Sequence, residues 1–300
     1  MLASLRAQSL DRDRFEVIVV DDASTDTTPE LLAVEADRCE LRLRVLRHAV
    51  STGPGGSRND GWRMSRAPLV AFTDDDCVAS PGWLQQGLAA WGGNPERFVQ
   101  GATTPIAAES HLLGHTAYSY DVTERDDDFQ TCNMFYPRAL LDRLGGFDSA
   151  AFPDVGEDTD LAWRAIEAGA EPVFAPGAAA EHAVIEMDFR RALRRCWSWG
   201  GAAPLYFRHP ALRRERLLYR VFWNWQHYTA GRAWIAVLLP WSPALWALKA
   251  WLAAPWLADR ARDPGSRSPS ARRAAWFAVL DTVEMVSMVR GSVASGRLVV

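Results

Sequence analysis

The stretch EVIVVDDASTD, residues 16–26, decides the fold. Its β-branched run is typical of a strand buried on both faces. Asp21 and Asp22 follow this run directly, and Thr28 with Pro29 then predicts the N-terminus of a helix. A buried strand that ends in acidic residues and leads into a helix is typical of an α/β sheet.

The same pattern returns further along the chain. Residues 69–77, LVAFTDDDC, are an apolar run followed by three aspartates. Residues 41–46 predict another strand, residues 53–56 a loop and residues 57–65 a helix. We expect a mostly parallel α/β sheet with its acidic residues at the carboxyl ends of strands, where such sheets bind ligands.

The composition is that of an ordinary globular protein, with 48% hydrophobic and 23% charged residues among 300. The net charge of −4 argues against a protein that coats nucleic acid, so we expect no nucleic-acid partner. Four cysteines without a CxxC pair favour a reduced cytoplasmic protein over a disulfide scaffold or a zinc module.

The three aspartates at 74–76 suit the chemistry of a diphosphate leaving group. A hard divalent cation stabilises the charge that builds on such a group, and hard cations take oxygen ligands. Either Asp74 or Asp76 would bind the cation. The other would reach the ribose of a nucleotide-sugar donor or a metal-bound water. His182 is a further candidate ligand. A solvated acidic turn and a structural histidine are the alternatives.

Glu157 and Asp158 begin a helix that is predicted over residues 156–169. A carboxylate in this position suits a general base that takes the proton from an acceptor hydroxyl. The alternative is that acidic residues in a first helical turn only complement the helix dipole.

Two further pairs of residues are candidates for donor binding. Asp21 or Asp22 would accept a hydrogen bond from the ring N–H of uracil or guanine, and Arg58 with Asn59 would contact phosphate or ribose. The alternatives are an Asx-type turn for the aspartates and an ordinary pair of helical residues for Arg58 and Asn59.

Taken together and in this order, five stretches resemble the family 2 glycosyltransferases. They are EVIVVDDASTD (16–26), GGSRNDGW (55–62), LVAFTDDDC (69–77), NMFYPRALLDRLGGFD (133–148) and GEDTDLAWRAIEAG (156–169). The resemblance covers residues 2–185. It implies a GT-A fold of the Rossmann-like type, inversion at the anomeric carbon, a Mn²⁺ or Mg²⁺ cofactor, and a UDP-, GDP- or dTDP-linked sugar as donor.

By motif position, the resemblance also implies a role for each acidic residue. Asp21 or Asp22 is implied to bind the base of the donor nucleotide. Asp74 and Asp76 are implied to form the DxD metal and ribose site, and Asp158 is implied to be the catalytic base. His182 matches a histidine that closes the domain in this family and in some members binds the metal.

The sequence departs from the family at its start. The family's first strand and loop, of the type VSVVIPTYN, do not precede SLRAQSL, residues 4–10. That strand would lie centrally in the sheet, so the strand at residues 16–20 is expected to have an unpaired edge. We expect that the true start codon lies upstream of Met1.

Residues 1–187 are predicted to form the catalytic domain and residues 188–300 a helical region. Within the latter, residues 233–258 are apolar except for Lys249 and exceed the roughly 20 residues that span a bilayer. Prolines within this segment favour a break into two short helices that lie on or dip into a membrane. The alternative is a soluble helical subdomain.

Basic segments at residues 190–195, 213–220 and 259–273 would face anionic headgroups. We therefore expect an inverting glycosyltransferase of envelope or extracellular glycan synthesis, with a glycan or lipid-linked acceptor, at the cytoplasmic face of the membrane. The alternative is a non-catalytic sugar-nucleotide-binding or scaffolding protein. A nucleotidyltransferase would need a basic, glycine-rich loop near the first strand, and the sequence shows none there.

Overall fold

The computed structural model describes residues 1–113, 117–261, 271–296 and 298–300. The chain divides into two compact units. Unit 1 consists of Met1–Leu113 and Tyr118–Ile185, and unit 2 consists mainly of Glu186–Val300. The division at residues 187 and 188 into a catalytic domain and a helical region stays a prediction.

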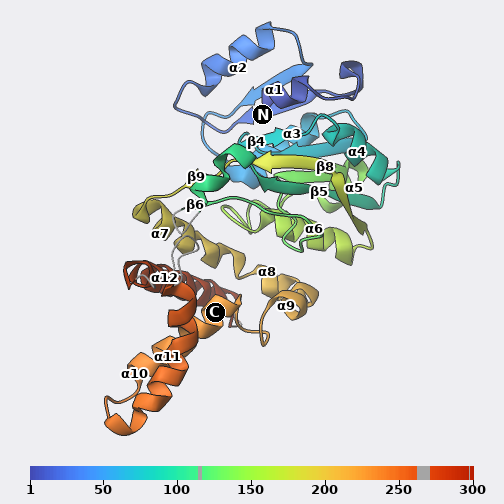
Figure 1. Cartoon of the computed structure of the whole chain (residues 1–300). Coiled ribbons are helices and arrows are strands. Elements are labelled where there is room, and N and C mark those ends of the chain that lie inside the picture. Colours follow the sequence, from blue (N-terminus) through green and yellow to red (C-terminus); the bar gives the residue numbers. More distant parts are fainter. Residues whose placement is uncertain (114–116, 262–270, 297) are drawn as a thin grey trace. The chain divides into compact units, whose positions relative to one another are not determined.

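Unit 1 contains two main sheets (Figure 1). Strands β1 (Val17–Asp21) and β2 (Leu43–Arg47) pair in parallel and form a sheet of their own. The larger sheet has five strands in the order β3-β7-β5-β8-β4. Their bounds are Leu69–Thr73 for β3, Cys77–Ala79 for β4, Arg97–Pro105 for β5, Asn133–Pro137 for β7 and Glu171–His182 for β8. Two short strands, β6 (Ala117–Tyr118) and β9 (Ile185–Glu186), form a third sheet.

The expectation of a mostly parallel sheet is wrong. In the five-stranded sheet β5 and β8 are the only neighbouring strands that pair in parallel, whereas β7 is antiparallel to both β3 and β5, and β4 is antiparallel to β8. The sheet is therefore mixed. An apolar run indicates a strand that is buried on both faces, and in this mixed sheet strands of either direction are buried in that way.

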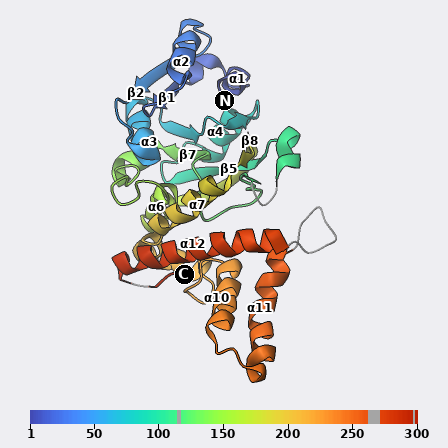
Figure 2. The same ribbon diagram turned by 90° about the vertical axis from the view of Figure 1, so that its left-hand side faces the viewer.

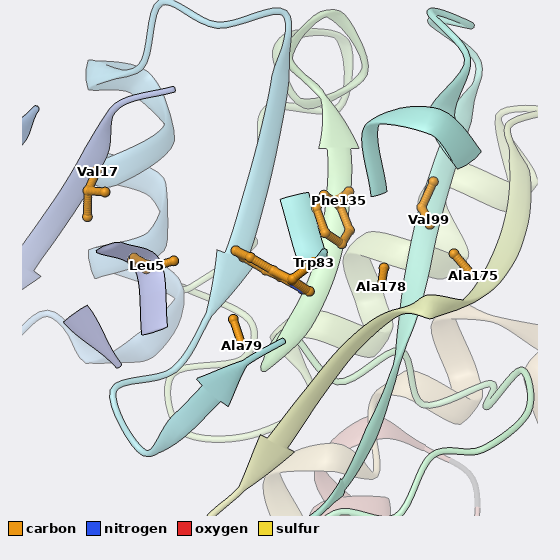
Figure 3. Packing of buried hydrophobic residues seen from close by; sticks show 8 residues of the cluster. All are labelled: Leu5, Val17, Ala79, Trp83, Val99, Phe135, Ala175 and Ala178. Atoms are coloured by element: carbon orange, nitrogen blue, oxygen red, sulfur yellow. The ribbon is translucent and has the colours of Figure 1, made fainter. Parts of the chain in front are cut away.

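The edge of β1 that faces away from β2 has no strand partner among the described residues, as predicted. Side chains pack near it instead. Leu5, from helix α1 (Leu2–Arg6), lies in one core cluster with Val17 of β1 and with Trp83 (Figure 3). The β1–β2 pair is thus held to the rest of unit 1 by side-chain packing rather than by a continuous hydrogen-bonded ladder.

Helix α3 corrects a second expectation. It spans Gly53–Met64, so residues 53–56 are helical rather than a loop. Glycine-rich sequence disfavours helix, but Asp22 accepts hydrogen bonds from the backbone N–H groups of Thr52 (2.8 Å) and Gly53 (3.0 Å). A carboxylate thirty residues earlier in the chain therefore stabilises the N-terminus of this helix.

The other helices of unit 1 cover the sheets. In Figure 1, α4 lies on one side of the five-stranded sheet and α6 on the other. The core between α4 and the sheet includes Trp83, whose indole stacks at a tilt on Phe135 of β7. The helices are α2 (Thr28–Asp37), α4 (Trp83–Trp91), α5 (Arg138–Leu144) and α6 (Glu157–Glu167).

Unit 2 is helical. Prolines at 240 and 243 separate α10 from α11, as predicted, but Pro255 lies inside α11 without ending it. No described helix combines the length and the apolar character that crossing a membrane requires. The helices are α7 (Phe189–Ser198), α8 (Leu205–Arg208), α9 (Pro210–Arg216), α10 (Trp225–Leu238), α11 (Trp246–Ala261) and α12 (Ala271–Ser295).

Candidate active site

The acidic loop at residues 74–76 connects β3 to β4. Asp74 and Asp76 are partly buried, whereas Asp75 is exposed. Burial raises the pKa of Asp76, and the nearby charge of Asp74 raises it further, against an opposing effect of His182. A partly buried carboxylate with a raised pKa gains when a cation binds beside it.

His182 and Asp76 face each other across this loop. His182 ends β8, and its Nε2 atom lies 3.5 Å from Oδ2 of Asp76. Its Nδ1 atom lies 2.7 Å from the carbonyl oxygen of Ala183. A carbonyl only accepts hydrogen bonds, so Nδ1 carries the proton and a neutral ring presents a lone pair at Nε2. The lone pair at Nε2 and the carboxylate of Asp76 thus face each other as two potential ligands of one cation.

Cys77 is the third residue of this group. It lies directly opposite His182 in the antiparallel pairing of β4 with β8. The potential ligand atoms of Asp76, Cys77 and His182 all lie within 4.8 Å of one another. Among the described residues, this donor set fits a divalent cation through Asp76 and His182. Cys77 cannot be recognised as part of this group from the sequence, because its place there depends on a cross-strand neighbour 105 positions away.

Asp74 has a different partner from the one expected of a metal ligand. Its Oδ1 atom accepts a hydrogen bond from Nη2 of Arg58 at 3.0 Å. Nη1 of the same guanidinium donates to Oε1 of Glu157 at 2.7 Å. Arg58 thus joins α3, the acidic loop and the start of α6. Three stretches that lie far apart in the sequence converge at one place, as the proposed chemistry needs.

The guanidinium of Arg58 stays positively charged in this environment. Burial lowers the pKa of the guanidinium, but the carboxylates of Asp74 and Glu157 outweigh this effect and raise it above its ordinary value. A partly buried arginine between two carboxylates is a fixed positive charge with planar donors, which suits a phosphate group.

Glu157 and Asp158 occupy different environments although they are neighbours. Glu157 is buried and forms the ion pair with Arg58. Asp158 forms no ion pair among the described residues, and its carboxylate accepts a hydrogen bond from the backbone N–H of Thr159 at 2.9 Å. Burial raises the pKa of Asp158 above its ordinary value, against the lowering effect of Arg58. Asp158 therefore fits a proton acceptor better than Glu157 does.

Substitution of Glu157 by glutamine is expected to flatten the pH dependence of stability. Burial and the charge of Asp158 raise the pKa of Glu157 from 4.5 to about 7. The folded protein then holds this proton more tightly than the unfolded chain, so the free energy of unfolding falls as the pH rises through this window. A shift of this size corresponds to a loss on the order of 3 kcal/mol.

Urea unfolding of wild type and Glu157→Gln at about pH 5 and about pH 8 measures this loss. The wild type should be less stable at the higher pH because Glu157 ionises, and Glu157→Gln should not show this loss. Glu30→Gln is the matched control, because Glu30 is an exposed acid in the first turn of α2. An identical pH dependence for wild type and Glu157→Gln would contradict the prediction.

Asp22 serves the fold rather than an open site. Besides the helix N-terminus of α3, it accepts hydrogen bonds from Oγ of Ser51 at 2.6 Å and from the ring of His48 at 2.7 Å. Burial raises the pKa of Asp22, but these hydrogen bonds outweigh burial and hold the pKa well below its usual range. Both carboxylate oxygens are therefore occupied.

Asp21 is buried at the end of β1 and has one free acceptor. Its Oδ1 atom accepts from the backbone N–H of Ser24 at 2.9 Å. Its Oδ2 atom has no hydrogen-bond partner among the described residues and lies 3.5 Å from Nε of Arg47. Of the two aspartates predicted to bind the donor base, only Asp21 has a carboxylate oxygen that accepts no hydrogen bond from the described residues.

Asn59 is the one predicted donor-binding residue whose side chain is fully engaged in the core. It is buried, and its Nδ2 atom donates to the carbonyl oxygen of Phe147 at 2.8 Å. Its Oδ1 atom accepts from the backbone N–H of Phe147 and from the indole N–H of Trp62, both at 2.9 Å. Asn59 fixes the turn at Phe147 against α3, so we leave it out of the donor site.

Sequence reasoning also missed Tyr136. Its side chain is buried in β7, and its hydroxyl has no hydrogen-bond partner in the part of the chain that the structure describes. Burial raises the pKa of this phenol, and the charge of Asp158 adds to the effect. A tyrosine in an apolar strand gives no signal in the sequence, because its proximity to Asp158 arises only when β7 and α6 pack in the same unit.

Residues 1–143 match the sequence model of the family described as Glycosyl transferase family 2. The resemblance to this family is confirmed. The family 2 region contains α3, the acidic loop and β7, and the fold is that of GT-A glycosyltransferases with a mixed α/β sheet.

Two of the curated proteins that this chain resembles are glycosyltransferases of Mycobacterium tuberculosis and Streptomyces hygroscopicus. A pre-mycofactocin glycosyltransferase of Mycobacterium tuberculosis is 30% identical over 224 residues, which cover 65% of this chain and 43% of that protein. A validoxylamine A glucosyltransferase of Streptomyces hygroscopicus is 29% identical and covers 54% of this chain and 46% of that protein. The chain spans about half the length of the curated relatives it matches.

The fold is similar to that of mannosyltransferase PcManGT from Pyrobaculum calidifontis, solved in complex with GDP-Man and Mn²⁺. The TM-score is 0.66 at 20% sequence identity, and the alignment covers 97% of this chain and 81% of the other. At this identity the likeness establishes the fold.

Proposed function

We propose that this chain is an inverting glycosyltransferase that moves a sugar from a nucleotide-diphosphate donor to a hydroxyl acceptor. One observation carries the proposal. Arg58 joins the loop of the Asp76–His182 pair, through Asp74, to the helix start that holds Asp158. A leaving-group site and a proton acceptor thereby lie at one place in unit 1.

In the proposed reaction each residue has one task. Asp76 and His182 hold a divalent cation, Mn²⁺ or Mg²⁺, which would supply positive charge to the departing diphosphate. Arg58 adds a second positive charge beside Asp74. Asp158 takes the proton from the acceptor hydroxyl as the new bond forms, while the bond from the sugar to the diphosphate breaks. Asp21, with its free acceptor, receives the N–H of a donor base.

The donor is proposed to be a UDP-, GDP- or dTDP-linked sugar. A GDP-mannose complex of a structural neighbour supports a nucleotide sugar of this class. We propose a glycan or lipid-linked acceptor in envelope or extracellular glycan synthesis, reached at the cytoplasmic face of the membrane. The apolar segment at residues 233–258 and the basic segments of unit 2 support this location. Of the basic segment 259–273, residues 262–270 lie outside the described residues.

A panel of nucleotide sugars tests the proposed function. Binding of UDP-, GDP- and dTDP-linked sugars to the full chain is measured by calorimetry, and turnover by release of the nucleoside diphosphate. We expect at least one donor to bind and to be consumed with Mn²⁺ or Mg²⁺, and EDTA to stop its turnover. Turnover that EDTA leaves intact would exclude the metal-dependent mechanism.

The same panel separates the enzyme from its alternative. A non-catalytic sugar-nucleotide-binding or scaffolding protein would bind a donor without consuming it in the presence of any acceptor. The observation that favours this alternative is the separate β1–β2 sheet. An unpaired Asp158 favours the enzyme, since a binding protein needs no general base.

A further inference from the structure

Helices α10 and α11 form a hairpin that projects from the rest of unit 2. Figures 1 and 2 both show them side by side, with their connection at the end remote from α12. Residues 233–248, which make up the end of α10, the connection and the start of α11, contain no ionisable side chain. We call residues 234–251 the hairpin tip.

The hairpin tip exposes large apolar side chains. Trp241 is 83% exposed and Leu238 80%, and Trp246 and Trp251 are each more than 60% exposed. The other exposed large hydrophobic residues of the tip are Trp234, Ile235, Val237 and Leu248. Single exposed hydrophobic residues are ordinary, but eight within one stretch of 18 residues mark a surface that another apolar phase covers.

The single charge in the tip, Lys249, is already compensated. Its ammonium donates to the carbonyl oxygens of Ala236 (2.6 Å) and Leu239 (2.9 Å), which are free acceptors at the C-terminus of α10. It also lies 4.6 Å from the ring centroid of Trp241. These contacts replace water around the ammonium, so the charge does not bar the tip from an apolar medium.

The net charge of unit 2 indicates which apolar medium covers the hairpin tip. Residues 186–300 contain 18 arginine and lysine side chains and seven acidic ones, whereas residues 1–185 contain 15 and 30. The net charge is therefore +11 in one part of the chain and −15 in the other. A strongly basic unit that carries an exposed apolar tip complements an anionic phospholipid surface, where each basic residue near the surface adds about 1 kcal/mol.

The dimensions of the hairpin allow insertion but not crossing. Helix α10 has 14 residues and α11 has 16, or about 21 and 24 Å at 1.5 Å per residue, against a hydrocarbon thickness of about 30 Å. Because α10 and α11 form a hairpin, the chain enters and leaves it on the same side. Arg232 marks the base of the tip, where its guanidinium lies 4.3 Å from the ring centroid of Trp251. Arginine and tryptophan together are typical of the headgroup level.

We propose that the hairpin tip inserts into one leaflet of an anionic phospholipid membrane and anchors the protein there. The inference goes beyond glycosyl transfer, because it gives unit 2 a binding function that needs neither donor nor acceptor. The basic residues of unit 2 stay at the headgroups, and Lys249 enters with its carbonyl partners.

Flotation of the full chain with lipid vesicles tests this anchor. We expect binding to vesicles of phosphatidylcholine mixed with phosphatidylglycerol, and weaker, salt-insensitive binding to phosphatidylcholine alone. The double variant Leu238→Ser, Trp241→Ser should bind anionic vesicles on the order of a hundredfold more weakly, because two exposed apolar side chains no longer enter the hydrocarbon. Lipids brominated along the acyl chain should quench tryptophan fluorescence in wild type and less in the variant.

The matched control is the double variant Leu31→Ser, Val34→Ser. Both residues are exposed hydrophobic positions on α2 in unit 1, with 54% and 56% exposure. This control should float like wild type, and circular dichroism should show that both variants are folded. An equal loss in both variants, or no flotation of wild type, would overturn the proposal. A hairpin-dependent dimer in ultracentrifugation without vesicle binding would identify a second copy as the true occupant. Since no nucleotide sugar is present, the result is independent of the proposed reaction.

Discussion

Asp158→Asn is expected to lower kcat by about 10²–10⁴-fold and to leave donor affinity unchanged. The amide has nearly the same shape as the carboxylate and keeps an oxygen for the backbone N–H of Thr159. It cannot take a proton from the acceptor hydroxyl. Because Glu157, not Asp158, holds Arg58, the ion pair next to the donor site remains in the variant.

Steady-state transfer and calorimetric donor binding, measured on the same preparations, check this expectation. Asp154→Asn is the control, because Asp154 is exposed in the loop before α6. It makes the same chemical change four positions away and should retain wild-type turnover. Normal turnover by Asp158→Asn would show that another group accepts the proton, and Glu157 would then be the next candidate.

Asp76→Ala is expected to abolish turnover and to weaken Mn²⁺ binding. The variant keeps His182 but loses the carboxylate that faces it at 3.5 Å, so the cation loses its anionic ligand. The same substitution should not destabilise the fold. Burial and the charge of Asp74 already raise the pKa of Asp76, so its removal relieves an unfavourable charge when no cation is bound.

Titration with Mn²⁺ and thermal unfolding without metal separate these two effects. Asp75→Ala is the control within the same loop, since Asp75 is exposed and lies outside the group formed by Asp76, Cys77 and His182. It should bind Mn²⁺ and turn over like wild type. If Asp75→Ala were as inactive as Asp76→Ala, the loop would act through its total charge and not through one ligand.

The strands before the acidic residues could be predicted because local sequence determines them. The β-branched run before Asp21 and the apolar run before Asp74 both end where the structure ends β1 and β3, to within one residue. Helix α6 could also be predicted from the sequence, because acidic residues occupy its first turn and Gly169 follows its end. Each of these signals lies within a dozen residues of the element it specifies.

The pairing of strands and side chains could not be predicted in the same way. The antiparallel insertion of β7 between β3 and β5 has no counterpart in hydrophobic periodicity. The helical start of α3 depends on Asp22, and the contact from Arg58 to Glu157 joins residues 99 positions apart. Residue types indicated which side chains carry chemistry, but only the fold shows which of them are occupied elsewhere, as with Asp22 and Asn59.

The separation of β1 and β2 from the larger sheet has a consequence for cooperativity. Backbone hydrogen bonds transmit order across a sheet, and among the described residues no ladder connects Val17–Asp21 to the five-stranded sheet. The β1–β2 region can therefore open as a foldon of its own while the β5–β8 core stays closed. Amide protons of β1 are expected to exchange with solvent sooner than those of β5, and a ligand bound at Asp21 would slow them selectively.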